Sequence, residues 1–189
     1  MLHKIEQALS AISYPGVPEG LYAPVAYALS GGGKRIRPTL LLMAYGMYRD
    51  DLQRAMPAAL AVEMYHNHTL LHDDLMDNAD VRHGKPTVHR RWNANTAVLS
   101  GDTMLIMAFR QAMQTECNRR DELLQLFART MQEVCEGQQY DVNFETRDDV
   151  GVDEYLEMIR LKTSVLLACA LKMGAIAADA PEDDAQLLY

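Results

Sequence analysis

Residues 55–77 read AMPAALAVEMYHNHTLLHDDLMD, and this stretch decides the predicted fold. Its apolar side chains recur at spacings of three and four residues, which is the period of an α-helix. The same period recurs along the chain, while the strict apolar–polar alternation that is typical of strands is nearly absent. We therefore predict an all-α protein with helices over residues 2–13, 20–30, 37–48, 55–77, 94–116, 121–143 and 153–178.

The composition favours one domain over residues 1–189, because 49% of the 189 residues are apolar and can form a substantial core. A formal net charge of −8 argues against a general nucleic-acid-binding protein, which usually has an excess of basic residues. The three cysteines are widely spaced and predict neither disulfides nor a metal site, so a reducing, cytoplasmic setting is expected. The longest apolar run is interrupted by Lys172 and is shorter than the ~18 to 20 residues of a membrane span, so we expect no such span.

Three aspartates lie near the C-terminal end of the 55–77 helix. Asp73 and Asp77 are four residues apart and share one face, with Asp74 beside them. Like charges at this spacing repel, and a helix C-terminus disfavours anions, so a compensating cation is expected. Carboxylate oxygens, completed by water and substrate phosphate, suit Mg²⁺. A solvated acidic face is the alternative, but the apolar run MYHNHTLL just before the aspartates weakens it.

Histidines in the same helix leave a different metal site open. His68 and His72 are four residues apart and could hold zinc or iron, as in metal-dependent phosphohydrolases that use a His–Asp pair. The absence of obvious further ligands counts against this alternative. His66 lies seven residues before Asp73, two turns back on roughly the same face, so it is expected to point into the same cavity.

Basic residues stand on both sides of the aspartates in two short segments. SGGGKRIRP (30–38) places Lys34 and Arg37 at the mouth of a helix, and its glycines let backbone N–H groups approach an anion. DVRHGKP (80–86) supplies three more basic side chains, which are Arg82, His83 and Lys85. Cations that flank a Mg²⁺ site suit a diphosphate better than a single carboxylate.

Two other acidic segments are interpreted as structural. RDDVGVD (147–153) belongs to a linker, and Asp153 is expected to be the N-cap of the next helix. PEDD (181–184) is expected to start a further helix, because acidic residues in a first turn complement the helix dipole.

Five motifs follow one another in the sequence: GGGKRIRP, LLHDDLMDNADVRHGKPTVH, GDTML, EGQQYD and LKTSVLL. With them the sequence closely resembles the trans-isoprenyl diphosphate synthases, the farnesyl and geranylgeranyl diphosphate synthase family, over essentially the whole chain. The resemblance implies an isoprenoid-synthase-type helical bundle around a central cavity and a single polyprenyl synthetase domain. Family members continue into a second aspartate-rich motif that is absent here, so residues 1–189 are expected to be the N-terminal portion of such a domain, truncated at its C-terminus.

The resemblance implies a prenyltransferase that condenses isopentenyl diphosphate head-to-tail with an allylic diphosphate. The implied reaction is a Mg²⁺-dependent sequence of ionisation, condensation and elimination, with Mn²⁺ as a substitute metal. Family members are usually homodimers, so a homodimer is expected. Two alternatives stay open at this point, namely a non-catalytic partner subunit of a prenyl synthase and the phosphohydrolase described above.

The resemblance also assigns a role to individual positions. The metal ligands are Asp73, Asp74 and Asp77. The residues for the isopentenyl diphosphate are Lys34, Arg37 and His66, with His83 beside them. Those for the allylic diphosphate are Arg82, Lys162 and Thr163, and a polar pair facing the cavity is Gln138 and Asp141. The expected catalytic group is Asp73, Asp74, Asp77, Arg82 and Lys162.

Two further expectations concern specificity. His83 stands where the family usually has an arginine, which weakens the acceptor site or makes it sensitive to pH. His68 and Thr69, five and four residues before Asp73, match positions that close the floor of the cavity. Because His68 is of medium size, a product of fifteen or twenty carbons is expected.

Overall fold

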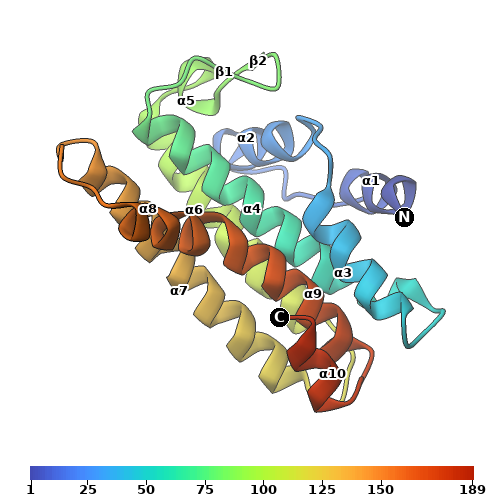
Figure 1. Cartoon of the computed structure of the whole chain (residues 1–189). Helices are drawn as coiled ribbons and strands as arrows, with labels where there is room; N and C mark the ends of the chain where they lie inside the picture. The colour runs from blue at the N-terminus through green and yellow to red at the C-terminus, as the bar shows by residue number, and fades with distance from the viewer. The chain divides into compact units, whose positions relative to one another are not determined.

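The computed structural model describes all residues from Met1 to Tyr189 and is helical almost throughout (Figure 1). The all-α prediction is therefore confirmed. The α-helices are α1 (Leu2–Ser10), α2 (Glu19–Leu29), α3 (Ile36–Gly46), α4 (Met56–Met76), α5 (Val88–Arg91), α6 (Ala94–Met113), α7 (Arg120–Phe144), α8 (Val152–Ile159), α9 (Val165–Ala177) and α10 (Glu182–Leu187). The remaining elements are a 3₁₀-helix η1 (Leu52–Ala55), a π-helix η2 (Arg160–Ser164), and the two-residue strands β1 (Val81–Arg82) and β2 (Lys85–Pro86).

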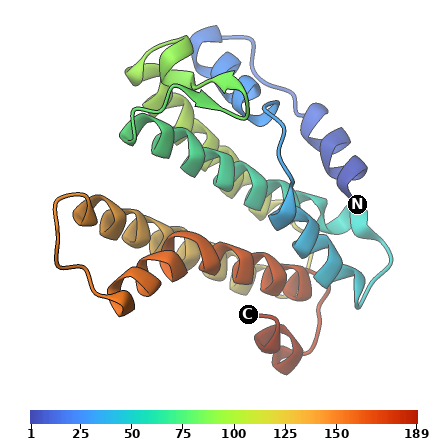
Figure 2. The same cartoon turned by 45° about the horizontal axis from the view of Figure 1, so that its top comes forward.

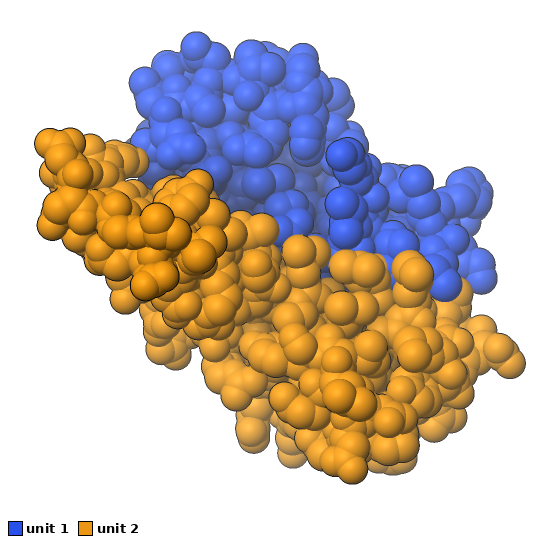
Figure 3. All heavy atoms as spheres, in the orientation of Figure 1, with its two compact units in different colours: residues 1–39, 56–114 blue, residues 40–55, 115–189 orange.

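The chain divides into two compact units, which Figure 3 colours separately. Unit 1 comprises residues 1–39 and 56–114, and unit 2 comprises residues 40–55 and 115–189. None of the helices combines the length and the apolar character that crossing a bilayer requires.

In unit 1, α4 and α6 lie side by side (Figures 1 and 2). The Asn93 side chain starts α6 as an N-cap, because its oxygen accepts a hydrogen bond from the Thr96 N–H at 2.8 Å. Gly101 lets α6 approach α4 closely, since a Cβ at this position would collide with the His72 ring. Helices α1 and α2 also pack on α4, so α4 is the central element and most of its side chains are buried.

In unit 2, α7 lies along the continuous run of η2 and α9 (Figures 1 and 2). The fully buried side chains of these helices include Leu123, Phe127, Cys169, Met173 and Ile176. Gly174 is a point of close approach, because a Cβ there would collide with the Leu41 carbonyl oxygen.

Several predicted boundaries differ from the observed ones. Residues 153–178 were expected to form one helix, but α8, η2 and α9 follow one another, with a π-helical turn in the middle. The expectation that Asp153 is an N-cap was wrong. Helix α8 begins at Val152, so Asp153 lies within its first turn. The Gly151 N–H just before the helix donates to the Glu154 carboxylate at 3.3 Å.

The hairpin of β1 and β2 and the short helix α5 were not predicted. The pairs Val81↔Pro86 and Arg82↔Lys85 are antiparallel and are joined through His83 and Gly84, which both have positive φ. The predicted helix start at 181–184 is confirmed, since Pro181 precedes α10 and three acidic residues occupy its first turn.

Candidate functional site

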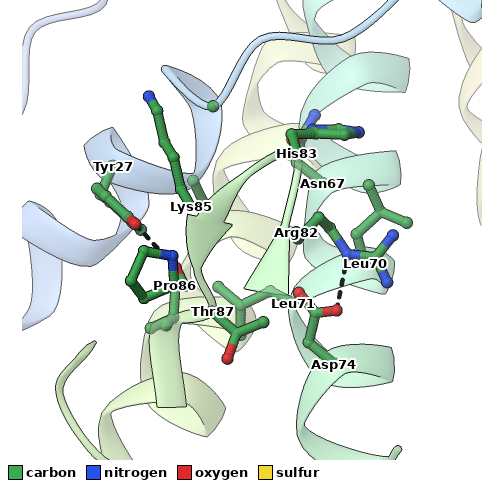
Figure 4. Close-up of a pocket in the computed structure, with 13 residues that line it drawn as sticks. Tyr27, Asn67, Leu70, Leu71, Asp74, Arg82, His83, Lys85, Pro86 and Thr87 are labelled. Carbon is green, nitrogen blue, oxygen red and sulfur yellow. Dashed lines mark hydrogen bonds and ion pairs between the residues drawn. The ribbon is translucent and has the colours of Figure 1, made fainter. Parts of the chain in front are cut away.

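The acidic end of α4 has a definite internal arrangement. The Asp77 N–H donates to the Asp73 carbonyl oxygen at 2.9 Å, so the two side chains stand one helical turn apart. Asp74 points instead toward the hairpin, where it accepts a hydrogen bond from Arg82 Nε at 2.7 Å (Figure 4). Arg82 Nη2 also lies 3.4 Å from Asp73 Oδ2. One guanidinium therefore partly neutralises two of the three carboxylates.

Burial distinguishes the three aspartates. Asp74 is only 5% exposed, and burial raises the pKa of its carboxyl while the bond from Arg82 lowers it. Asp77 is exposed. No group of three His, Cys, Asp or Glu side chains is arranged to hold a metal ion. Mg²⁺ commonly takes one or two protein carboxylates together with water and phosphate oxygens, which Asp73 and Asp77 could supply. Asp74 is bonded to Arg82, and the metal role of all three aspartates stays a prediction.

A second feature of unit 1 is a cavity of about 180 Å³. Its lining brings together four residues that the sequence assigned to one diphosphate, namely Lys34, Arg37, His66 and His83. Arg37 Nη1 donates to His66 Nε2 at 3.1 Å, while Arg37 Nε is buried and has no hydrogen-bond partner. Burial lowers the pKa of Arg37, and a buried guanidinium with an unmet donor favours an anion beside it.

His66 is held in its neutral form. Burial, and then the positive charges of Arg37 and Arg82, lower the pKa of His66 to about 3. At neutral pH its Nε2 can therefore accept the hydrogen bond from Arg37. His66 thus orients Arg37 and adds no charge of its own.

The hairpin of β1 and β2 contributes basic side chains to two neighbouring cavities. His83 lines the 180 Å³ cavity, and Arg82 lines an adjoining pocket of about 50 Å³ that also contains Asp74 (Figure 4). The hairpin is attached to α2, because the Tyr27 hydroxyl donates to the Pro86 carbonyl oxygen at 2.8 Å. This attachment is a tertiary contact between residues 59 positions apart, which the sequence did not indicate.

The sequence motifs did not single out Arg35, although it lies between Lys34 and Arg37. It is 3% exposed and forms ion pairs with Glu63 at 2.6 Å and with Glu6 at 2.8 Å. The available signal was Glu63 itself, a single acidic residue inside the apolar stretch of α4. Such a residue usually requires a buried partner.

The two residues predicted to limit product length lie on α4. His68 is 7% exposed, and its Nδ1 donates to the Gly101 carbonyl oxygen on α6 at 3.0 Å. Burial, followed by the neighbouring His72, lowers the pKa of His68 to about 4, so the ring is neutral at pH 7. The Thr69 hydroxyl donates to the His66 carbonyl oxygen at 2.8 Å. Their role in product length stays a prediction.

The histidine pair does not form the transition-metal site of the phosphohydrolase alternative. His72 Nε2 lies 3.2 Å from the Val98 carbonyl oxygen, and His68 is bonded to Gly101, so both rings are engaged with the α6 backbone. The rings pack edge to face at 4.6 Å. These contacts explain both histidines as part of the α4–α6 packing.

Unit 2 holds the remaining predicted residues. Lys162 Nζ donates to Asp141 Oδ2 at 2.6 Å, which joins the π-helical turn to α7. Gln138 lies three residues before Asp141 and so on the same side of α7. Thr163 is exposed. The structure therefore brings Asp141 and Lys162 together within this unit.

Gly137 fixes how closely η2 approaches α7. A Cβ at this position would collide with the backbone nitrogen of Lys162. We expect Gly137→Ala to cost about 1–3 kcal/mol of unfolding free energy, because the π-helical turn must move. Thermal unfolding checks this, with Gly151→Ala as the control, since its Cβ would meet no atom closer than 4.0 Å. Equal melting temperatures for the two variants would contradict the expectation.

Comparison with known proteins identifies the class first. A crystal structure of a geranylgeranyl pyrophosphate synthase matches with a TM-score of 0.91 and 53% identity, over 100% of this chain and 56% of that chain. A farnesyl/geranylfarnesyl diphosphate synthase (FPP/GFPP synthase) structure from Zymomonas mobilis matches with a TM-score of 0.91 and 31% identity, over 98% and 71% of the two chains. The fold is therefore the all-helical isoprenoid-synthase fold that was expected.

Sequence comparison then gives the family. A profile of the polyprenyl synthetase family matches residues 18–189, and the chain belongs to this family. The geranylgeranyl diphosphate synthase of Methanosarcina mazei is 43% identical over 173 residues, which are 90% of this chain and 53% of that protein. The short chain isoprenyl diphosphate synthase of Methanocaldococcus jannaschii is 41% identical over 100% of this chain and 57% of that protein. The chain thus spans a little more than half the length of these relatives.

Proposed function

We propose that the protein is a trans-prenyltransferase that condenses isopentenyl diphosphate with an allylic diphosphate to give a short prenyl diphosphate. Family membership and the names of its relatives support this class of reaction. The observation that carries the proposal is the unpartnered, buried Arg37 Nε in a cation-lined cavity of the unit that also carries the acidic end of α4. A diphosphate has the charge and the number of acceptor oxygens to satisfy such a cavity.

The acceptor substrate is assigned to the 180 Å³ cavity. Arg37 provides a planar pair of donors for the diphosphate of isopentenyl diphosphate, and exposed Lys34 adds a mobile positive charge. His66, which is neutral, holds the Arg37 guanidinium in place. His83 supplies a further donor from the hairpin.

The donor substrate is assigned to the acidic end of α4. Asp73 and Asp77 would hold Mg²⁺, which supplies stabilisation of the negative charge that grows on the departing diphosphate. Arg82 lies beside Asp73 and would also stabilise the negative charge on the departing diphosphate. Lys162 and Thr163 are assigned to the allylic diphosphate by their motif, and Gln138 and Asp141 to the polar pair of the same motif set. Within unit 2, Asp141 orients the Lys162 ammonium group.

The proposed chemistry proceeds in three steps. The allylic C–O bond ionises and leaves its electron pair on the diphosphate oxygen. The double bond of isopentenyl diphosphate attacks the allylic carbocation and forms the new carbon–carbon bond. A proton then leaves the carbon next to the new cation, passes to the released pyrophosphate, and restores a double bond. Apolar helix surfaces exclude water, which would otherwise capture the carbocation.

The product is proposed to contain fifteen or twenty carbons, with His68 and Thr69 as the residues that limit its length. His68 is fixed by its bond to Gly101, so its ring has a defined position. A larger or smaller side chain at this position would shorten or lengthen the product.

The test is incubation of the full-length protein with isopentenyl diphosphate and radiolabelled geranyl or farnesyl diphosphate. Elongated prenyl diphosphates are expected with Mg²⁺ or Mn²⁺, and none after chelation of the metal. Absence of elongation with every allylic substrate would contradict the proposal. It would favour the second candidate, a non-catalytic partner subunit, which the replacement of an arginine by His83 suggests.

The proposal includes a homodimer. Exposed apolar side chains recur at seven- or eight-residue intervals along α6, where they share a face, and these are Val98, Leu99, Ile106 and Met113. Such a stripe is typical of a helix that another helix covers. Sedimentation equilibrium is expected to give twice the chain mass, and a monomer at micromolar concentration would contradict this.

A further inference from the structure

The side chain of Arg35 connects three elements of unit 1. Its Nε donates to Glu6 Oε1 on α1 at 2.8 Å, its Nη1 to Glu63 Oε1 on α4 at 2.6 Å, and its Nη2 to the Leu29 carbonyl oxygen at the end of α2 at 2.9 Å. Asn67 Nδ2 also donates to Glu63 Oε1, at 3.1 Å. We name these five residues, Glu6, Leu29, Arg35, Glu63 and Asn67, the Arg35 cluster.

The backbone of Arg35 adopts a conformation that needs support. Its φ is +48°, in the left-handed region that residues other than glycine rarely occupy. Gly32 and Gly33, with φ of +84° and +135°, make the reversal that precedes it. This path leaves Lys34 exposed beside the cavity and directs Arg37, in the first turn of α3, into it. The side-chain bonds of Arg35 are what hold the path in place.

The cluster also gives buried Arg35 and half-buried Arg37 different electrostatic surroundings. Burial lowers the pKa of Arg35, but the bonds from Glu6 and Glu63 outweigh this effect and raise it. Arg37 has no such pair, and its Nε lacks any partner. The Glu63 carboxylate accepts its hydrogen bonds from Arg35 and Asn67, so it acts on Arg37 only through its charge and leaves Arg37 Nε without a partner. The cavity therefore keeps the positive charge of Arg37 for an anion.

Glu6 is the part of the cluster most open to change. Its side chain is 43% exposed, whereas those of Arg35 and Glu63 are 1% and 4% exposed. Replacing Glu6 therefore tests the cluster without burying an unpaired charge, which would endanger folding.

We propose that the Arg35 cluster positions Lys34 and Arg37 for the diphosphate of the acceptor substrate, so that α1, through Glu6, sets the affinity for that diphosphate. This inference rests on the proposed function, in which the same cavity binds isopentenyl diphosphate. Glu6, Arg35 and Glu63 act through Lys34 and Arg37 and are positioning residues.

The experiment is a calorimetric titration of the full-length protein with inorganic pyrophosphate in the absence of Mg²⁺, which removes metal-dependent binding at the acidic end of α4. Glu6→Gln is expected to weaken binding by about three- to tenfold, since it removes one charged hydrogen bond from a partly exposed pair. In steady-state assays, KM for isopentenyl diphosphate is expected to rise by the same factor. KM for the allylic substrate and kcat are expected to change by less than about twofold, a split that a general loss of stability would not produce.

The matched control moves the charge by one position. The double variant Glu6→Gln/Gln7→Glu keeps the net charge of α1 and places the carboxylate on the exposed neighbour Gln7. It is expected to bind as weakly as Glu6→Gln, because the effect depends on the contact with Arg35. Recovery of wild-type affinity would overturn the proposal, since the effect would then be one of overall charge.

Two further results separate this proposal from the proposed function. If Arg37→Ala loses pyrophosphate binding by tenfold or more while Glu6→Gln binds as tightly as wild type, the positioning role is wrong and the cavity assignment stands. If Arg37→Ala binds as tightly as wild type, the cavity is not the diphosphate site and both proposals fall.

Discussion

Asp73→Asn and Asp77→Asn are each expected to lower kcat by roughly 10³-fold, because each removes one of the two carboxylates proposed to hold Mg²⁺. Asparagine keeps the shape and the helical position of the side chain. What it loses is the negative charge that a divalent ion needs one helical turn from the second carboxylate. Turnover measured over a range of Mg²⁺ concentrations checks this, and the variants are expected to need much more metal for half-maximal rate.

Asp80→Asn is the matched control within the same acidic stretch. The Asp80 side chain is 78% exposed and pairs with Arg90 at 2.7 Å. Its kcat is expected to stay within about twofold of wild type. A similar loss in Asp80→Asn, or turnover above one-tenth of wild type in Asp73→Asn, would contradict the metal assignment.

Arg82→Met is expected to lower the free energy of unfolding by about 2–4 kcal/mol, because it leaves the buried Asp74 carboxylate without its cation. In a chain of this size that corresponds to a fall in Tm of roughly 5–15 °C. Removing Arg82 also removes an influence that lowers the pKa of Asp74, which burial already raises. The folded variant then retains a proton that the unfolded chain has released. Its stability relative to wild type therefore falls as the pH rises above about 4.

A double variant and a control separate this pair from ordinary surface charges. Arg82→Met/Asp74→Leu is expected to recover stability to within about 1 kcal/mol of wild type, because no buried charge is left unpaired. Arg90→Met breaks a pair whose side chains are 42% and 78% exposed, so its cost is expected to be below about 1 kcal/mol. Equal losses in Arg82→Met and Arg90→Met would contradict the assignment of Asp74 as a buried partner.

Helical periodicity was sufficient to predict the class of fold and the approximate position of each long helix. It could not predict the hairpin of β1 and β2, because strands of two residues carry no period and this hairpin is held by the contact of Tyr27 with Pro86. Capping propensity placed the N-cap at Asp153, because propensity alone does not register the hydrogen bond that the Gly151 N–H donates to the Glu154 carboxylate.

The sequence motifs indicated only part of the arrangement of the candidate site. Motif positions grouped Lys34, Arg37, His66 and His83, and these four residues line one cavity. Motif positions could not distinguish Asp74 from Asp73 and Asp77, because the three aspartates have the same chemistry and differ only in burial and in the side of the helix on which they lie. They also left out Arg35, whose importance lies in partners from α1 and α4 that are distant in sequence.

The π-helical turn at Arg160–Ser164 shifts the helical register between α8 and α9. A turn with i→i+5 hydrogen bonds takes up about one residue more than an α-helical turn, so a side-chain phase counted at about 100° per residue is wrong by up to one residue beyond it. A helical wheel drawn straight through 152–177 therefore superimposes residues that lie on different sides. A homologue with one residue fewer here would differ from this chain in the orientation of Lys162 and Thr163, with no change in any loop length.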